Sequence, residues 1–372
     1  MATYNLVAPC LFGLEGLVAD ELRNMGAENV TSENGRVFFS GGPEMVARAN
    51  IRLRCAERVE LVVGRFTATT FQKLIDGSEA IEWEKYVAKD DAFPVTGWSK
   101  ESALFSIPDC QATIKKAVVN RLGKVYGLSV LPETGPKVQI RFAIMKNTVT
   151  VMLDTSGAGL HKRGYREKSA AAPIKETLAA AMAYLARLYD DSTVYDPFCG
   201  SGTLLIESAM LARGIAPGIR RAFAAERWSF LPKEIWTSER LAAIENIKKG
   251  IPFRCIGSDC DPEAVKLTLE NAKKAGVGDC VTCTCADISD FSVKTDRGVI
   301  LTNPPYGERL LDTEEARRLY TVMGKVFPKE FGRRYLVISP DESFESFFGR
   351  EANKRRKLYN GMIKCQLYMY YK

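Results

Sequence analysis

The sequence has 372 residues, 46% of them hydrophobic, which is too long for one ordinary core and predicts two or three domains. Lys and Arg number 52 against 45 Asp and Glu. The formal net charge of +7 favours a polyanionic partner, although a mildly basic soluble enzyme has the same balance. No run of roughly eighteen apolar residues occurs and the N-terminus lacks a signal-peptide pattern, which excludes a membrane-spanning protein and predicts a cytoplasmic one.

The cysteines and the single histidine limit the chemistry. Ten cysteines without a repeating framework predict free thiols. The cluster Cys280, Cys283 and Cys285 predicts buried small side chains along a strand rather than metal ligands. With His161 as the only histidine, a two-histidine zinc site is impossible, and a nucleophile–histidine relay would have to use His161. The sequence therefore predicts no metal centre.

Two series of strands and helices fill the first half of the chain. The first series has a helix at 16–25, a strand at 36–39, a helix at 44–51 and a strand at 59–66, which predicts a small α+β module. The second has an extended segment at 104–107, a helix at 110–125, and strands at 138–144 and 148–154 that form a hairpin turning at Lys146-Asn147. A basic connector at 160–166 then marks a domain junction.

The second half has a different pattern. A helix at 174–189 begins directly behind Pro173, a favourable first-turn residue. From there to about residue 339 strands and helices alternate, which is typical of a mostly parallel α/β sheet covered on both faces. Residues 353–372 predict a terminal antiparallel hairpin with its turn at Asn360-Gly361. An antiparallel edge on a parallel sheet is common.

Residues 193–206 have the pattern of a strand, a glycine turn and the start of a helix. Gly200 and Gly202 would let the backbone approach a ligand closely; the alternative is a tight turn with no ligand. A dinucleotide site usually has three glycines, but Leu205 stands at the third position and Asp196 precedes the turn. An acid repels a pyrophosphate and attracts an ammonium group. The pattern therefore favours S-adenosylmethionine (SAM), whose amino-acid group carries an ammonium.

Acids also follow the next two predicted strands. Asp259 and Asp261 end the strand that starts at 254, and a carboxylate there can accept both ribose hydroxyls of an adenosine. Asp259 is the first choice, because Asp261 also suits the N-cap of a helix at 263–275. Asp287 and Ile288 follow the strand at 281–285. Asp287 could accept from the adenine amine while Ile288 packs on the ring, or Asp287 is a solvated loop acid. The long spacing between the glycine turn and Asp259 is attributed to an insertion at 217–236.

Asn303-Pro304-Pro305-Tyr306 follows the predicted strand at 297–302, at the end of the sheet where open α/β folds bind ligands. Prolines have no N–H, so the loop presents acceptors. The Asn303 side-chain oxygen and the Pro304 carbonyl could each accept one hydrogen of an amine, which aims the nitrogen lone pair at a methyl group. Tyr306 would stack on the base, a contact of about 1–3 kcal/mol. The alternative is a Pro-Pro turn that only ends a strand.

Taken together, these motifs resemble class I SAM-dependent RNA methyltransferases that carry an N-terminal THUMP domain, above all the bacterial enzymes that make N2-methylguanine in 23S rRNA. The similarity covers nearly the whole chain. Its motifs lie at 9–15, 160–166, 172–180, 196–203, 257–262 and 303–310. Where the family usually has an aliphatic residue between the two acids, this chain has Cys260.

The resemblance implies a ferredoxin-like module at 1–65, a THUMP RNA-binding domain at 66–158 and a Rossmann-like methyltransferase domain at 159–372, whose seven-stranded, mostly parallel sheet ends in an antiparallel hairpin. The cofactor-binding residues would be Asp196, Phe198, Cys199, Gly200, Ser201, Gly202, Thr203, Asp259, Asp261, Asp287 and Ile288. The catalytic residues would be Asn303, Pro304, Pro305 and Tyr306. The RNA-binding candidates are Lys162, Arg163, Arg166 and Lys168, with Arg220, Arg221 and 354–357 as further basic positions; each is equally well a solvated surface.

The predicted function is methylation of the exocyclic N2 of a guanine, with 23S rRNA as the expected partner and S-adenosylhomocysteine (SAH) as the product. The acceptor loop alone does not separate planar amines, so alternatives remain: a tRNA guanine-N2 enzyme, a DNA adenine-N6 enzyme, or one that methylates a protein glutamine. A non-catalytic RNA-binding assembly factor and, more distantly, a nicotinamide oxidoreductase are others. The basic N-terminal half favours RNA. The sequence determines neither the modified nucleotide nor the oligomeric state.

Overall fold

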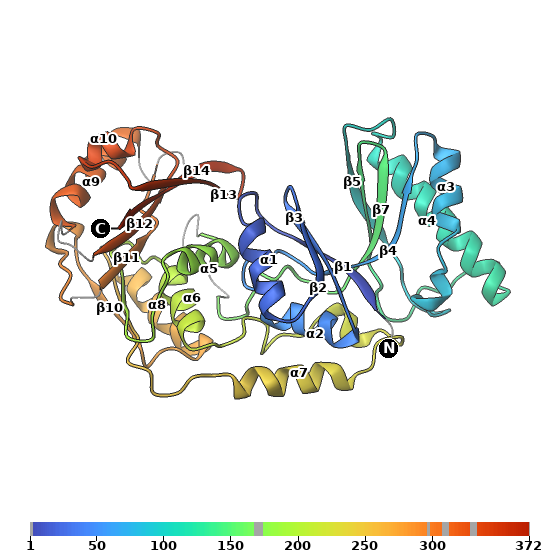
Figure 1. Cartoon of the computed structure of the whole chain (residues 1–372), viewed down its shortest axis with the longest axis horizontal. Helices are drawn as coiled ribbons and strands as arrows, with labels where there is room; N and C mark the ends of the chain where they lie inside the picture. The colour runs from blue at the N-terminus through green and yellow to red at the C-terminus, as the bar shows by residue number, and fades with distance from the viewer. Residues whose placement is uncertain (1–2, 167–173, 296–297, 307–311, 328–332, 372) are drawn as a thin grey trace.

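The computed structural model describes the chain except for residues 1–2, 167–173, 296–297, 307–311, 328–332 and 372. Three bodies lie in a row, with the C-terminal domain at one end, the N-terminal module in the middle and the second module at the other end (Figure 1). Among the helices of the described residues, none is long and apolar enough to cross a membrane.

The first two modules share one seven-stranded sheet with the order β2-β3-β1-β4-β7-β6-β5. The N-terminal module contains β1 (Tyr4–Pro9), α1 (Glu15–Asn24), β2 (Glu28–Glu33), β3 (Arg36–Gly41), α2 (Pro43–Arg52) and β4 (Glu60–Thr67). The second module contains α3 (Phe71–Glu79), η1 (Trp83–Lys85), β5 (Val95–Lys100), α4 (Ile107–Tyr126), β6 (Ile140–Met145) and β7 (Thr148–Asp154). Strand β4 pairs with both β1 and β7, so the predicted boundary at residue 65 lies inside a strand.

The C-terminal domain contains the other seven-stranded sheet, with the order β10-β9-β8-β11-β12-β14-β13. Its elements are α5 (Glu176–Leu185), β8 (Thr193–Asp196), α6 (Thr203–Ala212), η2 (Ala224–Arg227), α7 (Glu234–Glu245), β9 (Arg254–Asp259), α8 (Pro262–Ala275), β10 (Val281–Cys285), η3 (Ile288–Asp290), β11 (Gly298–Thr302), α9 (Thr313–Val326), β12 (Arg334–Ser339), α10 (Phe344–Phe348), β13 (Lys354–Asn360) and β14 (Ile363–Tyr371). Strands β10, β9, β8, β11 and β12 pair in parallel, whereas β14 pairs antiparallel with both β12 and β13. The predicted mostly parallel sheet with a terminal hairpin is confirmed.

Several local predictions were wrong. Residues 104–107 are not a strand; the extended segment is β5, and Ile107 already begins α4. Leu104 is buried, which explains the apolar signal there. Cys285 is exposed, because it ends β10 at the open edge of the sheet, whereas Cys280 is buried as expected. The helix predicted from 174 to 189 is shorter, and Pro173 lies outside the described residues.

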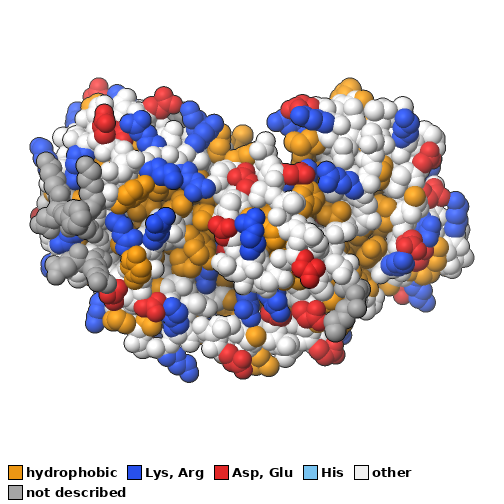
Figure 2. Space-filling view, viewed as in Figure 1, with side chains coloured by type: hydrophobic (Ala, Val, Ile, Leu, Met, Phe, Trp, Pro, Cys, Tyr) orange, Lys and Arg blue, Asp and Glu red, His pale blue; other side chains and the backbone are white. Residues whose placement is uncertain are grey.

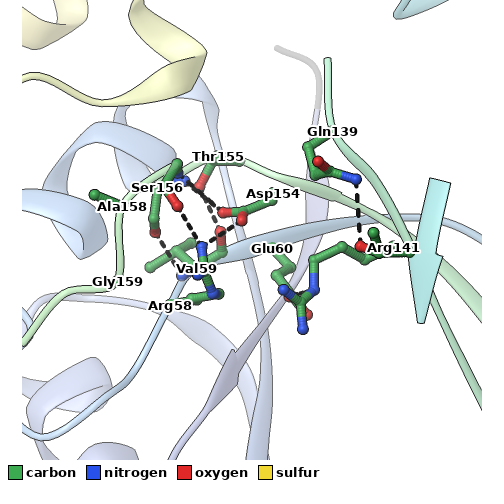
Figure 3. Close-up of polar contacts among 12 residues, drawn as sticks. Arg58, Val59, Glu60, Gln139, Arg141, Asp154, Thr155, Ser156, Ala158 and Gly159 are labelled. Carbon is green, nitrogen blue, oxygen red and sulfur yellow. Dashed lines mark hydrogen bonds and ion pairs between the residues drawn. The ribbon is translucent and has the colours of Figure 1, made fainter. Parts of the chain in front are cut away.

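A buried polar junction joins the N-terminal module to the segment that follows β7 (Figure 3). The Thr155 hydroxyl donates to the Val59 carbonyl at 2.6 Å, and the Val59 N–H donates to the Ser156 hydroxyl at 2.9 Å. The Arg58 guanidinium pairs with Asp154. Nearby, Glu60 faces Arg141, and burial raises the pKa of Glu60 to about 7 although the charge of Arg141 opposes the shift. These contacts tie the second module to the rest of the molecule at the root of β4 and β7.

The N-terminal module also packs on the C-terminal domain. Helix α7 lies along α2 in Figure 1, and Glu239 of α7 pairs with Arg48 at 2.7 Å and with Arg52 at 3.3 Å. The predicted insertion at 217–236 leads into α7, and the Trp228 indole N–H donates to the Lys137 carbonyl of the second module at 3.0 Å. The insertion and α7 therefore join the C-terminal domain to both preceding modules.

Candidate functional site: a cofactor edge beside an amine-binding loop

The carboxyl ends of the neighbouring parallel strands β10, β9, β8 and β11 bring the predicted motifs to one edge of the sheet of the C-terminal domain. Strand β8 lies between β9 and β11, and β10 lies beyond β9. The chain runs from β8 to one side of the sheet and returns to the other side with β11. Such a switch point is where open α/β sheets bind ligands. The glycine turn, both acidic segments and the Asn303–Tyr306 loop therefore meet here.

The two glycines of the turn have different roles. Gly200 has φ +52°, and a Cβ added there would meet nothing within 4 Å, so the backbone borders open space on that side. Gly202 has φ +78°, and a Cβ there would lie 2.8 Å from Cγ2 of Thr268 on α8. Only Gly200 therefore leaves room for a ligand, whereas Gly202 allows the turn to pack on α8. The sequence prediction that both glycines face a ligand needs this correction.

Helix α8 stabilises the turn through two side chains that the sequence analysis missed. The Thr268 hydroxyl donates to the Gly200 carbonyl at 2.8 Å. The Asn271 amide donates to the Ser201 carbonyl at 3.0 Å. Each contact joins positions about seventy residues apart, 68 and 70, so no local pattern reveals it.

Of the two acids after β9, Asp259 lies against the glycine turn. Its carboxylate accepts from the Gly200 N–H at 2.9 Å and from the Asp261 N–H at 3.1 Å. A carboxylate has about four lone-pair positions, so acceptor capacity remains for the hydroxyls of a ribose. Asp261 is exposed and caps α8, since its side chain accepts from the Glu263 N–H at 2.9 Å. The geometry favours Asp259 for the cofactor and gives Asp261 a structural role.

The acid after β10 is on the surface. Asp287 is exposed, and hydrogen bonds from the backbone and side chain of Ser289 lower its pKa. Its carboxylate is therefore ionised and available as an acceptor. Ile288 is 6% exposed and packs with Tyr195 and Ile300, which leaves it little surface to offer an adenine ring.

Asp196, at the end of β8, connects the cofactor motif to the acceptor loop. It is 1% exposed, and its Oδ1 accepts from the Thr302 hydroxyl at 2.6 Å and from the Phe198 N–H at 3.1 Å. Burial raises the pKa of Asp196 to about 7, with a smaller contribution from Asp259, while these two hydrogen bonds oppose the shift. Thr302, which directly precedes Asn303, is another residue that the sequence analysis missed.

The raised pKa of Asp196 predicts pH-dependent cofactor affinity. The ionised carboxylate attracts the ammonium group of SAH, and this form is lost as the pH falls through about 7. We expect the affinity for SAH, measured by calorimetry, to rise about tenfold between roughly pH 6 and 8, as the ionised fraction grows from about a tenth to about nine tenths. The affinity for 5′-methylthioadenosine, which lacks the amino-acid group, should stay constant. An equally flat profile for both ligands would argue against this role of Asp196.

The acceptor loop contains one buried oxygen with no partner. Among the described residues, nothing donates a hydrogen bond to Oδ1 of Asn303. Such an atom costs roughly 1–3 kcal/mol of lost solvation unless a partner reaches it. Pro304 is buried and Tyr306 is 8% exposed, so the loop is packed firmly on the domain. The Asn303 oxygen is thus placed to receive an N–H from a bound molecule.

Two arginines of the basic junction do not face solvent as a phosphate-binding surface would require. Arg163 is buried, with Nε 3.3 Å from Glu207, and its guanidinium also donates to the carbonyls of Leu160 and Arg54. Arg166 pairs with Glu176 at 2.9 Å. Arg166 also donates to the Thr203 hydroxyl at 3.1 Å, so it supports the start of α6 beside the glycine turn. These two predictions were wrong, because both guanidinium groups are used inside the protein.

The remaining basic candidates differ in how exposed their side chains are. Arg221 donates to the carbonyls of Ala158 and Gly159, which makes it structural as well. Lys162 is exposed and stays a prediction, whereas Lys168 lies outside the described residues. Lys354, Arg355 and Lys357 of β13 are exposed.

The geometry fits SAM on observations from this chain alone. Gly200 borders open space, Asp259 has acceptor capacity beside it, and Asp196 supplies a buried acid next to the acceptor loop. A metal has no comparable place, since within the described ranges no three His, Cys, Asp or Glu side chains are grouped to bind one.

Three family models match successive parts of the chain. They are an RlmL ferredoxin-like domain at residues 5–60, a THUMP domain at 68–154 and an RMKL-like methyltransferase domain at 163–369. "Putative RNA methyltransferase YpsC" of Bacillus subtilis is 40% identical, with 100% of this chain and 97% of the relative covered. The ribosomal RNA large subunit methyltransferase K/L of Shewanella frigidimarina is 31% identical, but the match spans 99% of this chain and only 52% of that protein. The chain thus spans about half the length of its K/L relatives.

Two solved structures have the same fold over the whole chain. "SMU.472, a putative methyltransferase complexed with SAH" is 41% identical with a TM-score of 0.94, and the match covers 100% of this chain and 98% of that one. A predicted N6-adenine-specific DNA methylase from Listeria monocytogenes is 44% identical with a TM-score of 0.95, at 100% and 97% coverage. With a ferredoxin-like module, a THUMP domain and this cofactor edge, the chain belongs to the RMKL-like family of SAM-dependent RNA methyltransferases.

Proposed function

We propose that this chain transfers the methyl group of SAM to the exocyclic N2 of a guanine in large-subunit ribosomal RNA. The observation that carries the proposed amine chemistry is the buried Oδ1 of Asn303, which has no partner among the described residues and lies in a loop that Thr302 joins to Asp196. This oxygen would accept one hydrogen of an amine, and we propose that the Pro304 carbonyl accepts the second. The guanine N2 amine has two hydrogens.

The chain's own residues would orient the amine rather than deprotonate it. When bound, SAM supplies an activated methyl group at a sulfonium centre. Two acceptors, Asn303 and Pro304, would draw both hydrogens out of the reaction path, so that the nitrogen lone pair points towards the cofactor edge. The alkylated nitrogen is strongly acidic and releases its proton to solvent, so no strong base is required. Tyr306, predicted to stack on the base, is only 8% exposed, so a base would meet little of its surface.

RNA is favoured as the acceptor over DNA or protein. The THUMP domain and the names of the relatives point to RNA, and the K/L names point to the large subunit. Figure 2 shows Lys and Arg side chains on both sides of the notch between the catalytic domain and the THUMP domain, interspersed with Asp and Glu side chains. We propose that the basic side chains contact the RNA backbone. The adenine-specific DNA activity named for the Listeria structure remains the competing function, because adenine N6 is also a planar amine.

The test is methyl transfer from labelled SAM to separated rRNA, tRNA, DNA and protein fractions, followed by nuclease digestion and mass spectrometry. We expect the label in N2-methylguanosine from the 23S fraction. Label only in N6-methyladenine of DNA would overturn both the substrate class and the base. N2-methylguanosine in tRNA alone would keep the chemistry and overturn the ribosomal assignment.

A further inference from the structure

The hairpin formed by β13 and β14 ends in a two-residue turn. Asn360 and Ile363 are the last paired positions, so Gly361 and Met362 form the turn, one position later than the sequence predicted. Gly361 has φ +66°, as the first residue of a type II′ turn requires, whereas Asn360 is not among the residues with positive φ. The turn geometry therefore does not explain why an asparagine stands at 360.

Asn360 uses its side chain outside the hairpin. It is 3% exposed, and its amide donates to the Tyr306 hydroxyl at 2.8 Å. Tyr306 follows β11, and the order β11-β12-β14-β13 separates its strand from β13 by two others. The hydrogen bond thus reaches across the end of the sheet to the acceptor loop. Buried groups of this kind are costly to leave unpaired, so the pair fixes both partners.

The N-terminal module supports the hairpin from its other side. The Arg356 guanidinium donates to the Gly13 carbonyl at 2.6 Å. A Cβ on Gly13 would lie 2.9 Å from the Lys357 carbonyl, so the two backbones are in close contact. Phe12 meets Tyr359 edge-on, with ring centroids 6.3 Å apart. Strand β13 lies beside the N-terminal module in Figure 1.

We infer that Asn360 is a positioning residue of the acceptor loop: it binds the Tyr306 hydroxyl and thereby sets the Asn303–Tyr306 loop, from a hairpin that the ferredoxin-like module supports. Tyr306 is two residues from Pro304, and the two prolines between Asn303 and Tyr306 restrict the backbone of the loop. A shift of Tyr306 would therefore also shift Asn303 and Pro304. An amine that must meet both Asn303 and Pro304 tolerates little displacement, since a shift of about 1 Å can cost about 100-fold in rate. This inference rests on the proposed role of the loop but not on which RNA is the substrate.

A double-mutant cycle tests whether Asn360 acts through the Tyr306 hydroxyl. Asn360→Leu, Tyr306→Phe and the double variant are compared for kcat, KM and SAH affinity, with labelled SAM and whichever fraction the wild type methylates. We expect each single change to lower kcat about tenfold, the double variant to be no slower than the slower single one, and SAH affinity to change less than twofold. Asn353→Leu is the matched control, because the Asn353 side chain accepts from the Tyr371 N–H at the far end of the hairpin.

Two outcomes would overturn the inference. One is an equal loss from Asn360→Leu in the wild type and in the Tyr306→Phe variant, which would show that Asn360 acts elsewhere. The other needs no acceptor: hydrogen exchange of the Tyr306 amide should become at least tenfold faster in Asn360→Leu than in Asn353→Leu, and unchanged exchange would contradict the contact. Failure of the proposed function has a different signature, namely that the wild type methylates no guanine at all.

Discussion

Replacing Asn303 with alanine is expected to lower kcat for methyl transfer by about 100-fold or more, with SAH affinity unchanged within about twofold. The side chain removed contains a buried acceptor oxygen, Oδ1, that has no hydrogen-bond partner among the described residues. Without it the amine keeps one hydrogen bond instead of two and rotates away from the methyl group. The residues proposed to bind the cofactor, Gly200, Asp259 and Asp196, lie on other loops, so binding of SAH should persist. Single-turnover transfer of labelled methyl groups measures the effect.

The control for this prediction is Asn303→Asp. An aspartate keeps an acceptor oxygen at nearly the same position, so we expect it to retain more activity than the alanine variant, although its charge disturbs the packed loop. Alanine and aspartate variants that are equally slow would indicate that the asparagine N–H groups matter instead. An alanine variant with more than half of the wild-type kcat would contradict the amine-binding role.

The largest effect on stability is expected from Glu207→Ala, which should reduce the free energy of unfolding by about 3–5 kcal/mol. Glu207 is fully buried on α6, and its Oε1 receives the Tyr165 hydroxyl at 3.0 Å and lies 3.3 Å from Nε of Arg163. Its loss leaves the buried Arg163 charge without its carboxylate partner, and the carbonyls of Leu160 and Arg54 compensate only part of the desolvation. Urea unfolding followed by circular dichroism measures the change.

Two comparisons separate the effect of the unpaired Arg163 charge from that of the space left by the Glu207 side chain. Replacing both partners, in Arg163→Met with Glu207→Leu, removes the unpaired charge and should recover a large part of the lost stability. Asp20→Ala breaks the exposed pair with Arg23 on α1 and should have no measurable effect. If Glu207→Ala were as harmless as Asp20→Ala, the burial of the Arg163–Glu207 pair would not matter to the fold.

The catalytic half could be predicted well from the sequence because its central strands are fully buried. β8 and β11 are short apolar runs that end directly in Asp196 and in Thr302-Asn303, so composition marks both the strand and its carboxyl end. The strands missed were β1, β2 and β5 of the other sheet. No element was predicted for the buried run Leu6-Val7-Ala8 of β1. β2 and β5, at the two edges of that sheet, contain only exposed and half-buried residues, so they lack an apolar signal. Tertiary pairing, not local preference, makes them strands.

The same limit applies to the candidate site. Motif residues such as Gly200, Asp259 and Asn303 are recognisable from sequence because each lies at the carboxyl end of a strand or shortly after it. Their supporting contacts are not, since Thr302 meets Asp196 across 106 positions and Asn360 meets Tyr306 across 54. A basic run such as 162–166 suggests a charged surface, because the sequence does not show which acids pair with its arginines. Glu207, which pairs with Arg163 inside the protein, lies on α6, 44 positions further along the sequence.

The central claim is that this chain methylates a base amine bound by the Asn303 loop, and the most direct measurement is made on RNA from cells. 23S rRNA from a strain lacking the gene is digested and compared by mass spectrometry with RNA from strains complemented with the wild type or with Asn303→Ala. The account predicts one N2-methylguanosine that disappears with the gene and returns only with the wild type. Full restoration by Asn303→Ala, or an unchanged set of methylated guanines in the deletion strain, would contradict it.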